Sequence, residues 1–230
     1  MNKFKNAHWW MLLAFVVMQA GFIKGYWMNW SNEPWIDHVH GFSAMSWYLL
    51  LIVQPYFATR KKMELHRLWG MLGLFLAGGT AFSALAVISR NVASGDHGAE
   101  TGNFDPTFIY GVITSDLVMI VAFIIAVIMA IIKRKKLNDH AIWITSTVLY
   151  IMSAGLGRAV AVIFKMPFIP ALNVSGIIII VAFIIMGFRL KQLKHPAIIF
   201  GIVVNLSVFP IAWLGKQQWY IDFLHAIMKY

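Results

Sequence analysis

The sequence lacks cysteine altogether and carries little charge. Its 230 residues include no Cys, and 12% of them are charged against 60% hydrophobic. The missing cysteine excludes disulfides, Cys-ligated zinc, iron–sulfur clusters and covalently attached c-type haem. A soluble domain has about 25% charged residues, so the scarcity of charge excludes that class as well. What remains is an integral membrane protein.

The net charge of +10 needs a separate explanation, because basic chains often bind nucleic acid. Such binding requires a basic patch on a polar surface. The mean hydropathy is +0.72, so this chain has almost no polar surface on which a patch can lie. We therefore expect no nucleic-acid partner and expect the lipid bilayer instead.

Long apolar stretches account for most of the sequence. A helix that crosses about 30 Å of hydrocarbon needs about 20 such residues. The connections are short, so residues 1–230 are expected to form one all-α, polytopic transmembrane domain. The first stretch ends in Lys24, Trp27 and Trp30 rather than in small residues, which indicates a retained helix and not a signal peptide. The seven expected spans are roughly 8–28, 39–59, 67–89, 107–132, 140–164, 170–188 and 196–214.

Lysine and arginine lie mainly on one side of these spans. Basic residues collect on cytoplasmic connections, so their distribution predicts the orientation. Of the 19 Lys and Arg residues, 13 fall at one set of span ends, 5 at the other, and Arg158 inside a span. We expect a cytoplasmic N-terminus and an outside C-terminus in a bacterial inner membrane. The cytoplasmic set is Lys3, Lys5, Arg60, Lys61, Lys62, Arg67, Lys133, Arg134, Lys135, Lys136, Arg189, Lys191 and Lys194, and the outer set is Lys24, Arg90, Lys165, Lys216 and Lys229.

Two segments outside the spans have a distinct composition. Residues 91–106 are the longest polar stretch and are expected to form a flexible outer loop. The tail after Gly215 carries aromatic and aliphatic side chains and is expected to lie along the outer interface as a short helix. These side chains are Trp219, Tyr220, Phe223 and Leu224.

Two ionisable residues remain deep inside the expected spans, Asp116 in the fourth and Arg158 in the fifth. Such a group is costly in a membrane unless it is paired or hydrated, so each is a candidate functional residue. They lie about 13 Å and about 9 Å from the outer ends of their helices, at 1.5 Å per residue. They are expected either to form a structural ion pair or to build a site for an anion, headgroup or propionate around Arg158. An Arg158 that snorkels outward is a third alternative.

His66 and His140 lie at the cytoplasmic ends of two stripes that are expected to face inward. In the fifth span, side chains from His140 to Arg158 recur every three or four residues and share one helix face. In the third span, the stripe that begins at His66 continues through Gly70 and Gly73, where a flat ligand can come close. The two imidazoles are expected at similar depth, where they can ligate a transition metal or haem b. Alternatively, both are hydrated interfacial residues.

The second span carries His40 near its outer end and Gln54 deeper, within about 40° of each other on the helical wheel. Pro55 removes a backbone donor, so a kink is expected there, which either lines a cavity or serves helix packing alone. On the outer side, Asp37, His38 and His40 carry atoms of the kind that ligate metals. They can form a metal site only with a further ligand nearby.

The polar elements of the second to fifth spans come in a characteristic order. They are His40, Gln54-Pro55, His66-Arg67-Leu68-Trp69-Gly70, His140-Ala141-Ile142-Trp143 and Arg158. This order resembles a family of uncharacterised bacterial multi-pass membrane proteins with a domain of unknown function. The family usually continues the last His-x-x-Trp element with Met, whereas this chain has Ile144.

The core of that family also looks like that of b-type membrane cytochromes, which implies a haem between helices by analogy of fold alone. Two departures from the cytochrome pattern limit the analogy. His66 and His140 lie nearer the membrane edge than haem ligands generally do, and His40 has no partner histidine within the membrane. The resemblance therefore implies at most one haem.

Three hypotheses of function follow. The first is electron transfer or another membrane redox step, with His66 and His140 as ligands, Arg158 balancing charge, and a redox protein or quinone as partner. The second is a transporter or sensor for a small molecule or ion. Its polar site is formed by Asp116, Arg158, His40 and Gln54. The third is a metal-dependent hydrolase built on Asp37, His38 and His40, which lacks the further ligands and the general base that such an enzyme needs.

Overall fold

The computed structural model describes residues 4–102 and 105–228, and the regular structure of these residues is helical throughout. The expected all-α fold is thereby confirmed, with 85% helix and no strand in the described part of the chain. The elements are α1 (Ala7–Phe22), the 3-10 helix η2 (Trp27–Asn32), α2 (Trp35–Thr59), α3 (Met63–Thr101), α4 (Thr107–Ile132), α5 (Leu137–Phe164), α6 (Phe168–Leu190), α7 (Pro196–Leu206), α8 (Ile211–Leu214) and α9 (Gln218–Ile227).

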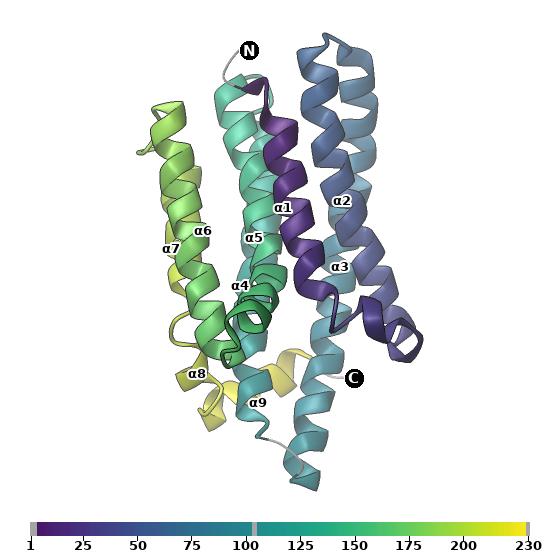
Figure 1. The fold of residues 1–230 in the computed structure, drawn as a ribbon, viewed down its shortest axis with the longest axis vertical. Helices are drawn as coiled ribbons and strands as arrows, with labels where there is room; N and C mark the ends of the chain where they lie inside the picture. Colours follow the sequence, from purple (N-terminus) through teal and green to yellow (C-terminus); the bar gives the residue numbers. More distant parts are fainter. Residues whose placement is uncertain (1–3, 103–104, 229–230) are drawn as a thin grey trace.

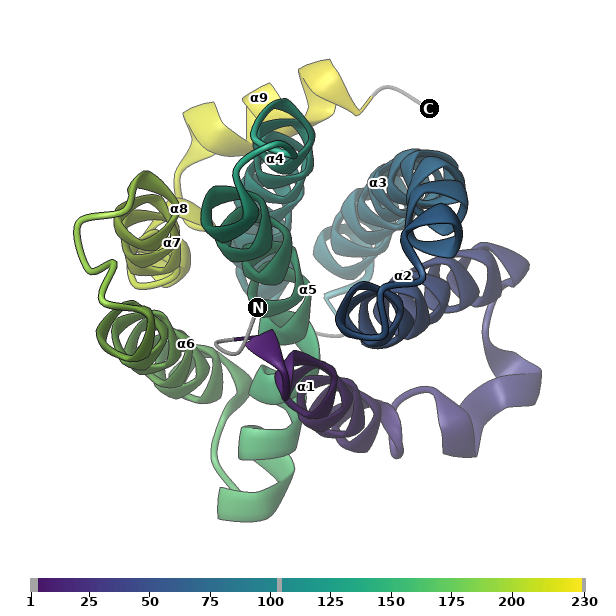
Figure 2. The ribbon, with the colours of Figure 1, turned by 90° about the horizontal axis from the view of Figure 1, so that it is seen from above.

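The long helices form an up-and-down bundle. Successive helices from α1 to α7 run in alternating directions along the long axis, and α9 crosses the lower end (Figure 1). The view along the axis shows α5 in the middle, where it packs against α1, α4 and α6 (Figure 2). Below, the upper and lower ends of the bundle are those of Figure 1.

Prolines mark the points where several helices begin. Pro34, Pro106 and Pro167 directly precede α2, α4 and α6, and Pro196 is the first residue of α7. Proline fits there because its fixed φ suits a first turn, in which its missing N–H has no intrahelical partner. α3 ends at Gly102, whose φ of +65° is one that glycine adopts without strain.

Four helices, α3 to α6, are long and apolar enough to cross a membrane. Many of their apolar side chains are exposed, which is compatible with contact with a lipid bilayer. α2 is 25 residues long but is interrupted by polar side chains such as His40 and Gln54. α1 has 16 residues and α7 has 11, fewer than the expected first and seventh spans contain.

The expected seventh span, residues 196–214, is not one continuous helix. α7 ends at Leu206, and a turn over residues 207–210 separates it from α8. Pro210 has no N–H to donate to the preceding turn, and the Ser207 hydroxyl donates to the Val204 carbonyl at 2.6 Å. These two residues end the helix, although hydropathy along the stretch stays high.

The prediction of an outer loop over residues 91–106 is wrong for most of that range, because α3 continues as a helix to Thr101. Residues 103 and 104 lie outside the described part of the chain. The extension is helical because it has a packing partner on one side. Val92 joins a buried apolar cluster with Tyr110 of α4 and Leu224 of α9. Gly95 lets the Tyr110 ring come so close that an added methyl group would lie 2.9 Å from it.

The C-terminal tail forms the short amphipathic helix expected from the sequence, α9. Tyr220 and Leu224 face the bundle and are buried, whereas Trp219 and Phe223 are exposed. The Thr114 hydroxyl of α4 donates to the Tyr220 hydroxyl at 2.6 Å, and His225 pairs with Asp96 at 2.8 Å. α9 is therefore fixed to the lower ends of α3 and α4.

The contact between α1 and α5 predicts a strong effect of one substitution. A methyl group added to Gly155 would lie 2.7 Å from the Met18 carbonyl oxygen, and one added to Gly21 would overlap the Gly155 backbone. Gly155→Leu is expected to force the two helices apart and to lower stability by about 1–3 kcal/mol or more. Thermal unfolding of the purified protein in detergent measures the loss.

Gly78→Leu is the matched control, because an added group at Gly78 meets no heavy atom within 4 Å. The control is expected to unfold within about 0.5 kcal/mol of the parent. Equal losses in the two variants would contradict the close α1–α5 contact.

Candidate functional site

A cavity of about 410 Å³ lies between the helices in the lower half of the bundle. We call it the lower cavity. Side chains of α1 to α5, the α1–α2 connection and the start of α6 form its wall, which is mainly apolar. Its size and apolar character are those of a site for a small molecule. The polar side chains that matter below are Arg158, Asp116, His40, Ser115, Asp37 and Arg90.

Arg158 projects from α5 into this cavity, and among the described residues no carboxylate lies within 4.0 Å of its guanidinium. Its guanidinium donates one hydrogen bond, to the Ala154 carbonyl at 3.0 Å. The guanidinium carbon lies 4.7 Å from the ring centre of Phe22 and 5.6 Å from that of Phe168. Cation–π contacts of this kind stabilise a partly desolvated cation. A guanidinium has five N–H donors, so most donors of Arg158 stay available to a ligand.

Asp116 lines the same cavity from α4. A direct ion pair with Arg158, one of the alternatives from the sequence, is absent among the described residues, whose three ion pairs within 4.0 Å involve other side chains. The two opposite charges therefore share one cavity and are separated within it. One ligand can contact both.

His40 is the third residue of the expected polar site that lines the cavity. Its Nδ1 lies 3.2 Å from the Ser83 hydroxyl, which in turn donates to the Thr80 carbonyl. Because the Ser83 hydrogen is already used, Nδ1 of His40 is the donor, and Nε2 of the neutral ring is an acceptor. Gln54, the fourth expected residue, lies outside this cavity.

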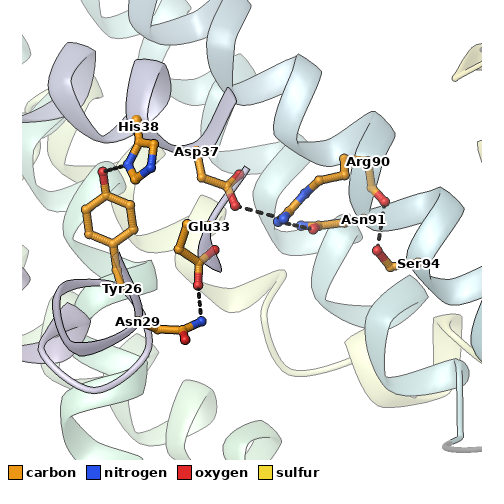
Figure 3. A network of polar contacts seen from close by, with 8 residues as sticks. All are labelled: Tyr26, Asn29, Glu33, Asp37, His38, Arg90, Asn91 and Ser94. Carbon is orange, nitrogen blue, oxygen red and sulfur yellow. Dashed lines mark hydrogen bonds and ion pairs between the residues drawn. The ribbon is translucent and has the colours of Figure 1, made fainter. Parts of the chain in front are cut away.

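The lower rim of the cavity is held by polar contacts between α2, α3 and the α1–α2 connection (Figure 3). Arg90 of α3 forms an ion pair with Asp37 at 2.8 Å and donates to Asn91 at 3.1 Å. The Tyr26 hydroxyl lies 2.8 Å from Nδ1 of His38. These contacts join the α1–α2 connection to α2 and α2 to α3.

The expected outer metal site at Asp37, His38 and His40 does not assemble. The three side chains turn to three different partners, Arg90, Tyr26 and Ser83. In residues 4–102 and 105–228 no group of three or more His, Cys, Asp or Glu side chains is arranged to hold a metal ion. His38 follows Asp37 by one residue and precedes His40 by two, so it points to a different side of α2. Asp37 and His40 both line the lower cavity but bond to different partners.

A second polar group, which we call the upper cluster, consists of Gln54, His66 and His140. The rings of His66 and His140 lie edge to face, with centroids 6.3 Å apart and an angle of 84° between the ring planes. Nδ1 of His140 donates to the Ala130 carbonyl at 2.8 Å, which leaves Nε2 as an acceptor in the neutral ring. Nδ1 of His66 and both polar atoms of Gln54 are buried without a hydrogen-bond partner.

The glycine stripe of α3 packs against α2 rather than around a flat group. A methyl group added to Gly73 would meet Leu50 at 2.7 Å, so Leu50 fills that part of the stripe. Gly70 is more open, since the nearest atom to an added methyl group is Nε2 of Gln54 at 3.9 Å. Leu50 therefore occupies space along this stripe that a haem would need, and Gly70 is the open position beside the upper cluster.

Two contributions to the lower cavity were not expected from the sequence. α1 supplies Phe22, although only the second to fifth spans were expected to enclose a pocket. Arg90 was counted as an outer charge, and its ion pair with Asp37 was missed. The sequence does place Asp37 and Arg90 at the outer ends of consecutive expected spans, which allows an ion pair between them. Which charges pair there depends on how α2 and α3 are packed.

Comparison with protein-family models, curated proteins and solved structures finds no match for this chain. The resemblance to the uncharacterised membrane family and to b-type cytochromes therefore stays an expectation. The lower cavity and the upper cluster are the two places in the described structure where polar side chains gather inside the bundle.

Proposed function

We propose that this protein binds a small organic anion in the lower cavity and acts as a carrier or sensor for it. The observation that carries the proposal is the guanidinium of Arg158, which has one hydrogen bond and no ion pair in the described structure. A cation in an apolar wall binds an anion strongly because little water competes for it. A carboxylate fits best, since a guanidinium can hold it through two parallel bonds.

The rest of the cavity restricts the ligand further. Phe22 and Phe168 stack on the guanidinium and offer an apolar surface beside it. Asp116 accepts hydrogen bonds on another part of the wall, so it favours a ligand that also carries a donor. We therefore propose a carboxylate with a compact apolar body and a hydroxyl or amino group. Lactate, phenyllactate and phenylalanine are suitable probes of these features.

Arg158→Gln is expected to abolish carboxylate binding, because the neutral amide cannot replace the charged, two-pronged donor. Arg158→Lys keeps the charge and is expected to bind with about 10- to 100-fold lower affinity. Calorimetry and thermal shift of the detergent-purified protein, titrated with the three probes, measure these effects.

Lys165→Gln is the matched control, because it removes a positive charge at the same end of α5 outside the cavity. It is expected to bind like the parent. Binding that survives Arg158→Gln, or is lost equally in Lys165→Gln, would sink the proposed site. Uptake of a bound probe into proteoliposomes then separates a carrier from a sensor.

We also propose that the chain crosses a bacterial inner membrane seven times, with its upper end in the cytoplasm. The alternating directions of α1 to α7 support this topology. So does the charge distribution, because the basic turns after α2, α4 and α6 all lie at the upper end. In this topology the short helices α1 and α7 cross together with the segments that follow them.

The absence of cysteine makes the topology directly testable. Each of four lysines is replaced singly by cysteine. In intact cells, the cysteines at the positions of Lys5 and Lys61 are expected not to react with a membrane-impermeant maleimide, and those at Lys165 and Lys216 are expected to react. Lysis should make all four sites reactive, and the unsubstituted chain is the control. Labelling of Lys5→Cys and Lys216→Cys from the same side would contradict an odd number of crossings.

A second candidate function is favoured by the upper cluster. His66 and His140 lie edge to face, and the hydrogen bond from His140 to the Ala130 carbonyl orients one ring, as such bonds orient histidines that ligate metals. We propose a transition metal or haem b there, which would supply electron-transfer chemistry with a quinone or redox protein as partner. Nδ1 of His66 and the side-chain amide of Gln54 are buried without hydrogen-bond partners, which supports the proposal that a ligand binds here.

His66→Ala and His140→Ala are each expected to lower bound metal or haem to background, because neither imidazole can hold the group alone. Elemental analysis and the visible spectrum, with and without dithionite, measure the content. His225→Ala is the control, since that residue pairs with Asp96 at the lower end. A colourless, metal-free parent that takes up neither haem nor metal would rule out this second function.

A further inference from the structure

A second hollow, of about 530 Å³, lies at the upper end of the bundle, away from both polar groups described above. It forms where the start of α1 meets the end of α2, and we call it the upper groove. The side chains that matter for its chemistry are Lys5, His8, Trp9, Tyr56 and Arg60. Neither proposed function uses them.

The upper groove carries positive charge without compensation. Lys5, just before α1, and Arg60, just after α2, both line it, and none of the described acidic residues does. In the described part of the chain neither forms an ion pair. Arg60 lies over the Tyr56 ring, with 5.5 Å between the guanidinium carbon and the ring centre. This contact orients the cation and leaves its N–H donors free for an anion.

Two further observations indicate that a hydrogen-bonding group is missing from the groove. Nδ1 of His8 is buried and has no hydrogen-bond partner. The N-terminus of α1 is uncapped, because the side chain of Asn6 makes no capping bond and the first turn contains no acidic residue. The free N–H groups of that turn favour negative charge. Both features are satisfied by an anion with several oxygen atoms.

The aromatic surroundings fix the depth of this anion. Trp9 lines the groove and is 61% exposed, and the next residue, Trp10, is 57% exposed at the same level of α1. Exposed tryptophans in a membrane protein lie at the level of the lipid headgroups. From these observations we infer that the upper groove binds the phosphate of an anionic phospholipid. The acyl chains of this lipid would lie along the exposed apolar face of α1.

The test uses the full-length protein in detergent and native mass spectrometry. Phosphatidylglycerol is compared with phosphatidylcholine of the same chain length, and inorganic phosphate is titrated separately. Each cation near a headgroup contributes about a fivefold factor, so the double variant Lys5→Gln/Arg60→Gln is expected to bind phosphatidylglycerol about 25-fold more weakly. His8→Phe keeps a ring but loses Nδ1 and is expected to weaken binding about two- to tenfold.

Lys135→Gln/Lys136→Gln is the control, because it removes two charges at the same end outside the groove. It is expected to bind like the parent. If both double variants bind phosphatidylglycerol equally weakly, the lipid responds to the overall charge of this end and not to the groove, and the inference is overturned. Equal binding of the two lipids would overturn it as well, and inorganic phosphate that binds as tightly as the lipid would assign the groove to free phosphate.

Discussion

The close approach of α1 to α5 is the contact on which the lower cavity depends. Gly21 and Gly155 let the two backbones touch, because any side chain at either position would collide with the other helix. Phe22 follows Gly21, and Arg158 lies nearly one turn after Gly155, so the contact brings the ring over the guanidinium at 4.7 Å. Wider spacing would leave the cation without its aromatic neighbour and would open the cavity wall.

A layer of buried aromatic side chains lies between the two polar regions of the bundle. Trp47 donates to the Thr147 hydroxyl at 3.1 Å, and Tyr48 donates to the Val148 carbonyl at 3.1 Å. Phe123 packs edge-on against Trp47. This layer joins α2 to α4 and α5 between the lower cavity and the upper cluster. The lower cavity and the upper cluster are therefore separated by packed side chains along the bundle axis.

Helical periodicity and depth explain most of what the sequence predicted well. His140 and Arg158 share a face of α5 because 18 residues make five turns, so the pairing with His66 and the entry of Arg158 into a cavity could be anticipated. Long-range packing explains the rest. The helical extension of α3 needs Tyr110 and α9, and the closure of the stripe at Gly73 needs Leu50. Neither follows from the local pattern, because each partner belongs to another helix.

The length of α3 has a practical consequence. Its 39 residues extend about 58 Å at 1.5 Å per residue, nearly twice the hydrocarbon thickness of about 30 Å. The excess lies at the lower end, where α9 and the start of α4 brace it. A protein of 26.1 kDa is small for single-particle imaging. This braced rod offers an antibody fragment a rigid epitope, and such a fragment would give the particle the bulk and asymmetry that image alignment requires.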